Sequence, residues 1–446
     1  MAGGGTFVTQ NKVRPGVYIK FTSKNTAGLT VGERGTVAIC QGMSWGVTDK
    51  IMEVEGGSNL VPFTGYDSTN PKNRFLNELF KGSNRTNAPT KVLLYRPNPS
   101  GAAKASATLD ALTVTAKYVG ERGNDIAIAV TELVDEEGSF TVTTLVDGDT
   151  VDTQTAKTVS ELTGNDWVTF SGDGALTANT GKSLTGGLDG TVDTGGYAAF
   201  LTALEPYKFD VLIYDGAEPT VQDAMIAFIK RLAEENGRYA QLVLAEAVNP
   251  DSRFVVNVVS GVTLSDGTVL SPQETTWWVG GAMAVATFNQ SLTGAVYPNA
   301  VAVEPVLTDS QICDKLTQGA LVLTCEQGIV RVEQDCNSLV TYTADIGKVY
   351  RKNRVIRLCS TIANDLYSQF VQNYVGIVNN DQQGRNQLKA AIVGYLLTIQ
   401  SSHGIQNLEA DDVTVLAGDD IDAVVVNLAI QAVDSMEKIY VTMELS

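Results

Sequence analysis

EKIYVTMELS, residues 437–446, ends the chain with an alternation of apolar and polar side chains. One face of this stretch would carry the apolar side chains of Ile439, Val441, Met443 and Leu445. A period of two is typical of a half-buried β-strand. Burying four such side chains gains about 6–12 kcal/mol, at about 1.5–3 kcal/mol each, whereas ordering ten residues costs about 10–20 kcal/mol of backbone entropy. The strand therefore needs the hydrogen bonds of a sheet, which belongs either to the same subunit or to a neighbour.

The other end of the chain carries a second strand pattern, in KVRPGVYIKF at residues 12–21. Val17, Ile19 and Phe21 alternate there with Tyr18 and a lysine. Both termini are thus predicted to be strands, although chain ends usually fray. The glycines at 3–5 and the stretch AVDSM at 432–436 are flexible sequences that can act as hinges.

Length and charge limit the class of protein. A chain of 446 residues is too long to fold around one hydrophobic core, so two to four domains are expected. The net charge of −18 argues against nucleic acid as the main partner. Residues 101–190 alone carry 14 acidic and 5 basic side chains, whereas residues 1–100 carry 6 and 12. The middle of the chain is therefore its acidic, solvated region.

The order of patterns predicts a multidomain α/β (α+β) protein with a mixed α/β core. Between Ser100 and LTGGLDG at 184–190, short strands and Gly/Asp turns predict an inserted antiparallel β domain. Apolar strands and a helix at 219–237 then predict a parallel sheet covered by helices. The predicted segments are an N-terminal arm (1–21), a first core segment (22–100), the β insertion (101–190), a second core segment (191–345), a C-terminal α/β domain (346–436) and a C-terminal strand arm (437–446).

The C-terminal α/β domain opens with the densest basic cluster of the chain. Residues 349–358 are interpreted as a basic strand, and helices follow with Leu388, Ile392, Tyr395 and Ile399 at helical spacing in the second. The basic cluster comprises Lys348, Arg351, Lys352, Arg354 and Arg357. It is either a solvated face or a docking strip for an acidic partner.

Candidate catalytic motifs are weak. Gly42–Gly46 matches GxSxG around Ser44, but a poor helix follows, and His403 is the single histidine of the chain. Gly181-Lys182-Ser183 lacks the first glycine of a phosphate loop. No cofactor and no metal site are expected, because the aspartates near 147–152 lack the positions of a calcium loop.

Cysteines and hydropathy exclude other classes. Five cysteines form no CxxC pair and predict reduced core thiols. The longest apolar run, near 277–288, is shorter than a bilayer span, and the N-terminus lacks a secretory leader pattern. Neither membrane insertion nor secretion is expected.

Several stretches together resemble the contractile tail sheath proteins of bacteriophages and phage-like bacteriocins. They are RPGVYIKF at 14–21, TVAICQGMSWG at 36–46, TGGLDG at 185–190, WWVGGAMAVATFNQSLTGAVYPNAV at 277–301, KNRVIRLCSTIANDLYSQFVQNYVGIVNN at 352–380 and VDSMEKIYVTMELS at 433–446. The resemblance covers nearly the whole chain in the expected order.

The resemblance implies a structural subunit without catalytic residues. Such subunits stack as hexameric rings around a tail tube, on a baseplate and below a terminator, and contract to drive the tube through the target envelope. Terminal strands would link neighbouring subunits through Val17, Tyr18, Ile19, Phe21, Ile439, Tyr440, Val441, Met443 and Leu445. The β insertion would lie outside, and the basic cluster Lys348, Arg351, Lys352, Arg354 and Arg357 would face the tube. The particle, an infectious phage or a bacteriocin, would assemble in the bacterial cytoplasm.

Two other hypotheses stay open at this point. One is a static structural or adhesive assembly with exchanged strands, which a change in polymer length would separate from a sheath. The other is a serine hydrolase that uses Ser44 and His403, which would lose its activity on Ser44→Ala.

Overall fold

The computed structural model describes residues 3–5, 16–18 and 29–445. The chain divides into two compact units. The core unit comprises Gly32–Asn364 and Ala432–Ser446, and the helical unit comprises Met1–Val31 and Asp365–Gln431. Helix α7 (Asn353–Asn373) contributes residues to both units.

A seven-stranded sheet forms the centre of the core unit, in the order β19-β15-β14-β13-β3-β5-β4. Neighbouring strands run parallel, except that edge strand β4 runs antiparallel to β5. The strands are β3 (Thr36–Cys40), β4 (Ile51–Glu55), β5 (Lys91–Tyr95), β13 (Val211–Ile213), β14 (Gln241–Ala245), β15 (Val255–Val258) and β19 (Ala320–Leu321).

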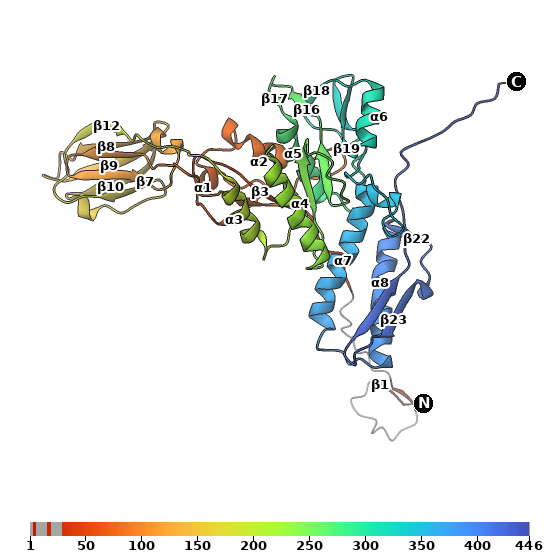
Figure 1. The fold of residues 1–446 in the computed structure, drawn as a ribbon. Helices are drawn as coiled ribbons and strands as arrows, with labels where there is room; N and C mark the ends of the chain where they lie inside the picture. The colour runs from red at the N-terminus through yellow and green to blue at the C-terminus, as the bar shows by residue number, and fades with distance from the viewer. Residues whose placement is uncertain (1–2, 6–15, 19–28, 446) are drawn as a thin grey trace. The chain divides into compact units, whose positions relative to one another are not determined.

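Both faces of this sheet are covered, which explains its apolar strands. In β3, Val37 and Ile39 belong to the hydrophobic cluster beneath α5 (Pro272–Val285), whereas Ala38 and Cys40 belong to the cluster beneath α3 and α4. Helices α3 (Thr194–Leu204) and α4 (Pro219–Glu234) pack together on that second face (Figure 1). The helix predicted at 219–237 is therefore present and ends three residues earlier.

Two glycines let α5 approach its neighbours closely. A Cβ atom on Gly280 would clash with Cδ1 of Ile213, and one on Gly281 would clash with the carbonyl oxygen of Leu79. Helix α5 therefore contacts both β13 and α2 (Arg74–Leu79), and a larger residue at either glycine would separate them.

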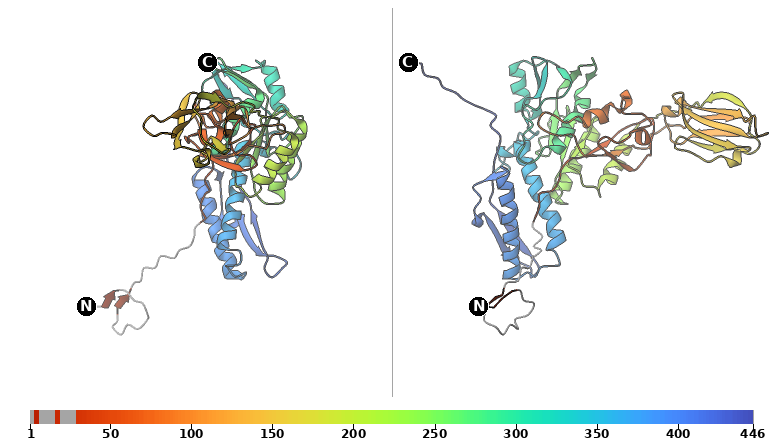
Figure 2. Two further views of the ribbon diagram at one scale, coloured as in Figure 1. Left: turned by 90° about the vertical axis from the view of Figure 1, so that its left-hand side faces the viewer. Right: turned by 180° about the vertical axis from the view of Figure 1, so that it is seen from behind.

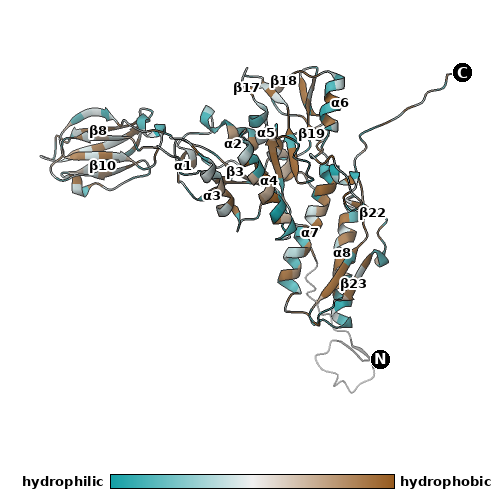
Figure 3. Ribbon diagram, viewed as in Figure 1, coloured by the Kyte–Doolittle hydropathy of each residue, from teal (hydrophilic) through white to brown (hydrophobic). Residues whose placement is uncertain are grey.

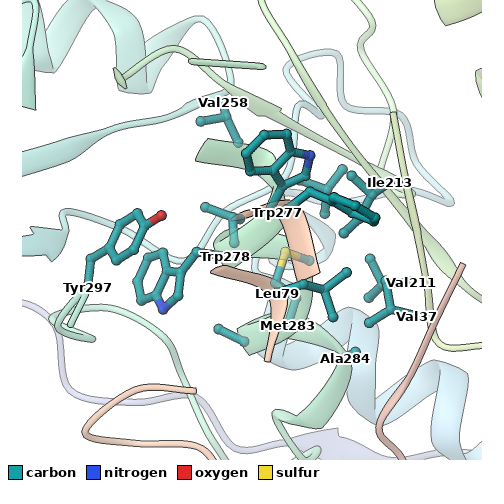
Figure 4. Close-up of a cluster of buried hydrophobic side chains, with 14 of the residues drawn as sticks. Val37, Leu79, Val211, Ile213, Val258, Trp277, Trp278, Met283, Ala284 and Tyr297 are labelled. Carbon is teal, nitrogen blue, oxygen red and sulfur yellow. The ribbon is translucent and has the colours of Figure 1, made fainter. Parts of the chain in front are cut away.

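Two stacked aromatic rings belong to the hydrophobic cluster beneath α5 and are buried. Figure 4 shows the rings of Trp278 and Tyr297 face to face, and their centroids lie 4.2 Å apart. The Trp278 indole donates a hydrogen bond to the Gly82 carbonyl at 2.7 Å, and the Tyr297 hydroxyl donates to Glu78 at 2.8 Å. Both rings thus bury their apolar bodies with their polar atoms satisfied.

The inserted β domain is a sandwich with its own core (Figure 2). Two antiparallel sheets form it, in the orders β10-β9-β8-β12 and β11-β7-β6. Its ends meet, because Ser100 N–H donates to the Thr191 carbonyl at 2.9 Å. The strands are β6 (Ser106–Leu109), β7 (Leu112–Ala116), β8 (Ile126–Glu132), β9 (Phe140–Val146), β10 (Asp149–Ala156), β11 (Val168–Ser171) and β12 (Asn179–Ser183).

Smaller elements complete the core unit. Strands β16, β17 and β18 form an antiparallel sheet, and β20 pairs with β21. These elements, with the remaining short helices, are α1 (Val61–Thr64), β16 (Gly261–Leu264), β17 (Val269–Leu270), β18 (Ala300–Glu304), α6 (Asp309–Thr317), β20 (Leu323–Glu326) and β21 (Ile329–Val332).

The helical unit packs helix α8 (Gln382–Ser401) beside the later turns of α7 and against β23. All four residues predicted to form the buried stripe of α8 are buried, and the Tyr395 hydroxyl donates to Asp365 of α7 at 2.8 Å. Strand β23 appears as hydrophobic in Figure 3. The strands of this region of the chain are β1 (Gly3–Gly5), β2 (Gly16–Tyr18), β22 (Ile405–Gln406), β23 (Val413–Ala417), β24 (Val424–Leu428) and β25 (Gln431–Ala432).

The mixed α/β multidomain fold with an antiparallel β insertion is confirmed, with two local corrections. The basic strand interpreted at 349–358 is wrong: a 3₁₀ turn at Lys348–Arg351 leads into α7, where Val355, Leu358 and Ile362 are buried at helical spacing. The five cysteines are free, but Cys313 and Cys325 are exposed rather than core residues. The division into six segments stays a prediction.

Candidate assembly site

The C-terminal arm, defined as Lys438–Leu445, is an extended segment that pairs with no strand among residues 29–445 (Figure 2). Its predicted buried face is almost fully exposed, with exposed fractions of 77% for Ile439, 79% for Val441, 78% for Met443 and 91% for Leu445. Tyr440 on the other face is 89% exposed. A row of apolar side chains with this exposure marks a surface that a partner would cover.

Glu437, the residue before the arm, is fixed by three side chains of the core unit. Its carboxylate accepts hydrogen bonds from the Lys352 ammonium, from Gln334 Nε2 at 2.9 Å and from Thr293 Oγ1 at 2.8 Å. Only 9% of its side chain is exposed. Burial would raise the pKa of Glu437, but the hydrogen bonds from Lys352, Gln334 and Thr293 hold it below its ordinary value. These four residues are called the Glu437 anchor.

A buried ion pair supports the anchor from beneath. The Asp335 carboxylate accepts from the Arg357 guanidinium at 2.5 Å, and neither side chain is more than 1% exposed. Burial would raise the pKa of Asp335, but the charge and hydrogen bonds of Arg357 hold it low. The Asp335 N–H donates to Thr293 Oγ1 at 2.9 Å, so the pair connects directly to the anchor.

The structure places the basic cluster mainly in internal contacts. Arg357 is buried in its pair with Asp335, Lys352 belongs to the anchor, and Arg354 is 7% exposed. The Arg351 guanidinium donates to the Leu316 carbonyl, and Lys348 is exposed. The tube-facing role of the cluster stays a prediction, and burial leaves Lys348, Arg351 and Lys352 as the members that reach the surface.

The predicted N-terminal linking residues are only partly described. Val17 and Tyr18 lie in β2, which pairs in parallel with β1, whereas Ile19 and Phe21 lie outside the described residues. Thr30 follows soon after these residues. Its N–H donates to Gln369 Oε1 at 2.8 Å, and its carbonyl accepts from Gln369 Nε2 at 2.6 Å.

The helical unit offers an open sheet. Strands β23 and β24 pair only with each other in the described chain, which leaves strand edges free. Val425 of β24 is 45% exposed. A cavity of about 500 Å³ opens beside β24, and its apolar lining comes from Phe370, Tyr374, Val375, Leu388, Val424 and Val426.

The GxSxG stretch lies at the joint between the β-sandwich and the rest of the core unit. Ser44 is buried, and its hydroxyl donates to Asp189 at 2.8 Å. Trp45 is 2% exposed and belongs to the hydrophobic core of the sandwich, where its ring lies 5.0 Å from that of Trp167. His403 belongs to the other unit, in the turn after α8.

Arg122 completes this joint from the sandwich side. Its Nε donates to the Gly65 carbonyl at 2.8 Å, and its two terminal nitrogens contact Asp147 at 2.8 and 2.7 Å. The guanidinium also lies 4.4 Å from the ring centroid of Tyr66. Arg122 and Trp45 therefore join the sandwich to the segments that follow α1 and β3.

The remaining motifs have structural roles in the described chain. Gly181, Lys182 and Ser183 lie in strand β12, and the Lys182 ammonium donates to the Thr108 carbonyl. No group of three or more His, Cys, Asp or Glu side chains within residues 29–445 could hold a metal ion. None of the described helices is long and apolar enough to cross a bilayer.

Comparisons with known proteins agree along the length of the chain. Sequence profiles match residues 100–189 as a phage tail sheath protein beta-sandwich domain, 190–338 as the phage tail sheath protein central domain and 345–446 as the phage tail sheath C-terminal domain. The phage-like element PBSX protein XkdK of Bacillus subtilis (strain 168) is 35% identical over 99% of this chain and 100% of its own length. The chain belongs to the phage tail sheath protein family.

Solved sheath structures share this fold. The sheath tail protein from Desulfitobacterium hafniense is 40% identical, with a TM-score of 0.87 over 96% of this chain and 99% of that one. The helical sheath of the anti-feeding prophage in its contracted state is 12% identical, with a TM-score of 0.60 over 97% of this chain and 99% of that one. The chain is thus a structural subunit of the tail sheath of a phage-like particle.

Proposed function

We propose that this sheath subunit polymerises as stacked hexameric rings around a tail tube and contracts to drive the tube through the target envelope. Each subunit would lend its terminal strands to its neighbours. The observation that carries the proposal is the exposed C-terminal arm on a fixed base. The fold shared with a sheath whose contracted state has been solved supports contraction.

Energetics favour a donated strand. Burying the apolar face of the arm would gain about 6–12 kcal/mol of hydrophobic free energy. In the free subunit this face lies in water, with Ile439, Val441, Met443 and Leu445 exposed. Its backbone groups also lack the ladder bonds that ordering requires. A neighbouring subunit can supply both at once, and a head-to-tail contact of this kind generates rings and helical polymers.

The proposed acceptor is the β23–β24 sheet of a neighbouring subunit. A strand added at an open edge completes the ladder, and the apolar cavity beside β24 can receive side chains from one face of the arm. Val17, Tyr18, Ile19 and Phe21 are the proposed N-terminal linking residues on the same principle.

The remaining partners follow from the same assembly. The tube would contact the C-terminal domain, with Lys348, Arg351 and Lys352 as the accessible members of the basic cluster, whereas Arg354 and Arg357 would act from the interior. The acidic sandwich would lie outside, and baseplate and terminator proteins would bound the sheath. Assembly would take place in the bacterial cytoplasm, in an infectious phage or a bacteriocin, without enzymatic activity, nucleic acid or membrane insertion.

Truncation tests this proposal directly. Variants that lack residues 437–446 or 1–21 are expected to be soluble, folded monomers that form no tubes in sedimentation or electron microscopy. Normal tubes from either truncation would contradict strand exchange. Micrographs of wild-type particles before and after triggering separate a contractile sheath, which shortens, from a static assembly, which keeps its length.

A further inference from the structure

We propose that Glu437 is a positioning residue that fixes the point from which the C-terminal arm leaves the core unit. Within the described part of the chain end, residues 433–445, the Glu437 carboxylate alone accepts hydrogen bonds from three side chains of the core unit. The inference rests on the proposed function, because an exit point matters only if the arm reaches a neighbour.

The three partners of Glu437 come from separate segments of the core unit. Lys352 precedes helix α7, Gln334 follows strand β21, and Thr293 lies in the loop between α5 and β18. Bonds from three directions restrain both the place and the orientation of a carboxylate. A single ion pair on the surface would not do so, because water competes for it.

The base beneath the anchor is rigid. Thr293 is bonded to the backbone of Asp335, whose carboxylate is buried against Arg357. Arg357 also donates to the Gln290 carbonyl at 2.7 Å. A continuous polar network therefore runs from the interior of the core unit to the first residue before the arm.

The anchor shortens the free tether of the arm. Residues 433–436 connect strand β25 to Glu437. Without the anchor, these four residues would add about 13 Å of reach in the extended state. Fixing the position of Glu437 raises the effective concentration of the arm near the acceptor sheet of a neighbouring subunit. It also reduces the conformational entropy that the arm loses when it pairs.

The anchor also decides which unit carries the arm. Glu437 binds only core-unit residues in the described structure, whereas the proposed acceptor strands β23 and β24 belong to the helical unit. A donated strand would therefore couple the core unit of one subunit to the helical unit of the next. Lys352, a member of the basic cluster, would hold Glu437 at the base of the arm.

The test compares Glu437→Gln with Lys438→Gln in the full-length chain. Both substitutions remove one charge from adjacent positions, but Lys438 is exposed and outside the anchor. We expect Glu437→Gln to lower the NMR order parameter of the backbone amide at residue 437 of the monomer from about 0.85 to below about 0.6, because bonds to a charged group are lost and the residue joins the free end of the chain. Tube growth, followed by light scattering, should slow about tenfold, whereas Lys438→Gln should match wild type in both measurements.

A second pair of variants guards against general destabilisation. Thermal unfolding of Glu437→Gln should match wild type. The charge-reversed pair Lys352→Glu with Glu437→Lys should restore some of the backbone order at residue 437 that either single reversal removes. Absence of any such restoration would count against a direct contact between the two side chains.

The outcomes separate the two proposals. If deletion of 437–446 abolishes tubes while Glu437→Gln behaves as Lys438→Gln does, the anchor is wrong and strand exchange stands. If the deletion variant still forms normal tubes, the proposed function itself is wrong.

Discussion

The β-sandwich and the C-terminal arm carry similar strand patterns but differ in what covers them. In the sandwich, alternating side chains close over a core of their own, with Val114, Ile128 and Val142 buried. In the arm, the same alternation leaves its apolar side chains in water. A period of two therefore predicts that a strand will pair, but not whether its partner lies in the same chain.

The two regions also join the core unit differently. The sandwich is bound by a buried tryptophan and by Arg122, which spans its junction. The arm is held at one residue, Glu437, and is free beyond it. The sandwich encloses a hydrophobic core, whereas the apolar side chains of the arm lie in water.

Blocking the backbone of the arm should have the largest effect. Val441→Pro removes a ladder donor from the middle of the strand and should abolish tube formation while the monomer stays folded. Val441→Thr keeps the N–H and the shape, so it should retain much of the assembly seen by sedimentation. Equal behaviour of the two variants would argue that the ladder is not needed.

Excising the sandwich should be milder, provided that its joint is removed as well. Ser100 and Thr191 are already hydrogen bonded, so a short linker can replace residues 101–190. Excision alone would expose Trp45, and we expect aggregation; excision together with Trp45→Ser should yield soluble protein that still polymerises. Loss of soluble protein in the double variant, with wild type behaving normally, would show that the sandwich is not separable.

Acid should loosen the arm through Glu437. Its folded pKa lies below its usual value near 4.5, so its carboxylate stabilises the attachment of the arm above that value, and this stabilisation is lost as the pH falls through the folded pKa. Lys352 pairs with Glu437 and also with Asp434. The NMR order parameter of the backbone amide at residue 437 should fall as the pH falls below about 4.5. Glu437→Gln should flatten this dependence, and an unchanged profile would exclude Glu437 as its source.

Reversing the accessible basic charges should have a smaller effect. Lys348→Glu with Arg351→Glu should weaken attachment of the extended sheath to an acidic tube, more at low salt than beyond about 0.15 M, where the Debye length is about 8 Å. Empty or prematurely contracted sheaths on micrographs are the expected result. Unchanged extended tails would reject the tube-facing role and leave the arm untouched.

Ser44→Ala should have the smallest effect. It removes a hydrogen bond to Asp189 at the sandwich joint, for which about 1 kcal/mol of stability is expected. Assembly and contraction should persist. A hydrolytic activity that disappeared in this variant would overturn the structural interpretation of the joint.

The sequence predicts the regions of the fold that local periodicity determines. The strands around Val37 and Val243 and the buried stripe of α8 follow from apolar spacing alone. The prediction for residues 349–358 is wrong because Arg354 and Arg357 occupy buried helix positions, and Asp335, the acidic partner of Arg357, comes from a separate segment of the chain. A charged residue at helical spacing does not reveal that it is paired in the interior.

The site was harder to predict, because its contacts connect distant segments. The arm itself is visible in the alternation of EKIYVTMELS. The anchor is not, since Thr293, Gln334 and Lys352 share no motif or spacing with Glu437. The burial of Trp45 could not be predicted either, because the sandwich residues that cover it lie from about position 105 to 184.

A reconstruction of assembled tubes by electron cryo-microscopy tests the central claim most directly, because it traces the arm from each Glu437. We expect residues 439–445 to form a strand that is hydrogen bonded to an edge of the β23–β24 sheet in a neighbouring subunit. An arm that folds back onto its own subunit, or that stays unpaired in a well-resolved tube, would contradict it.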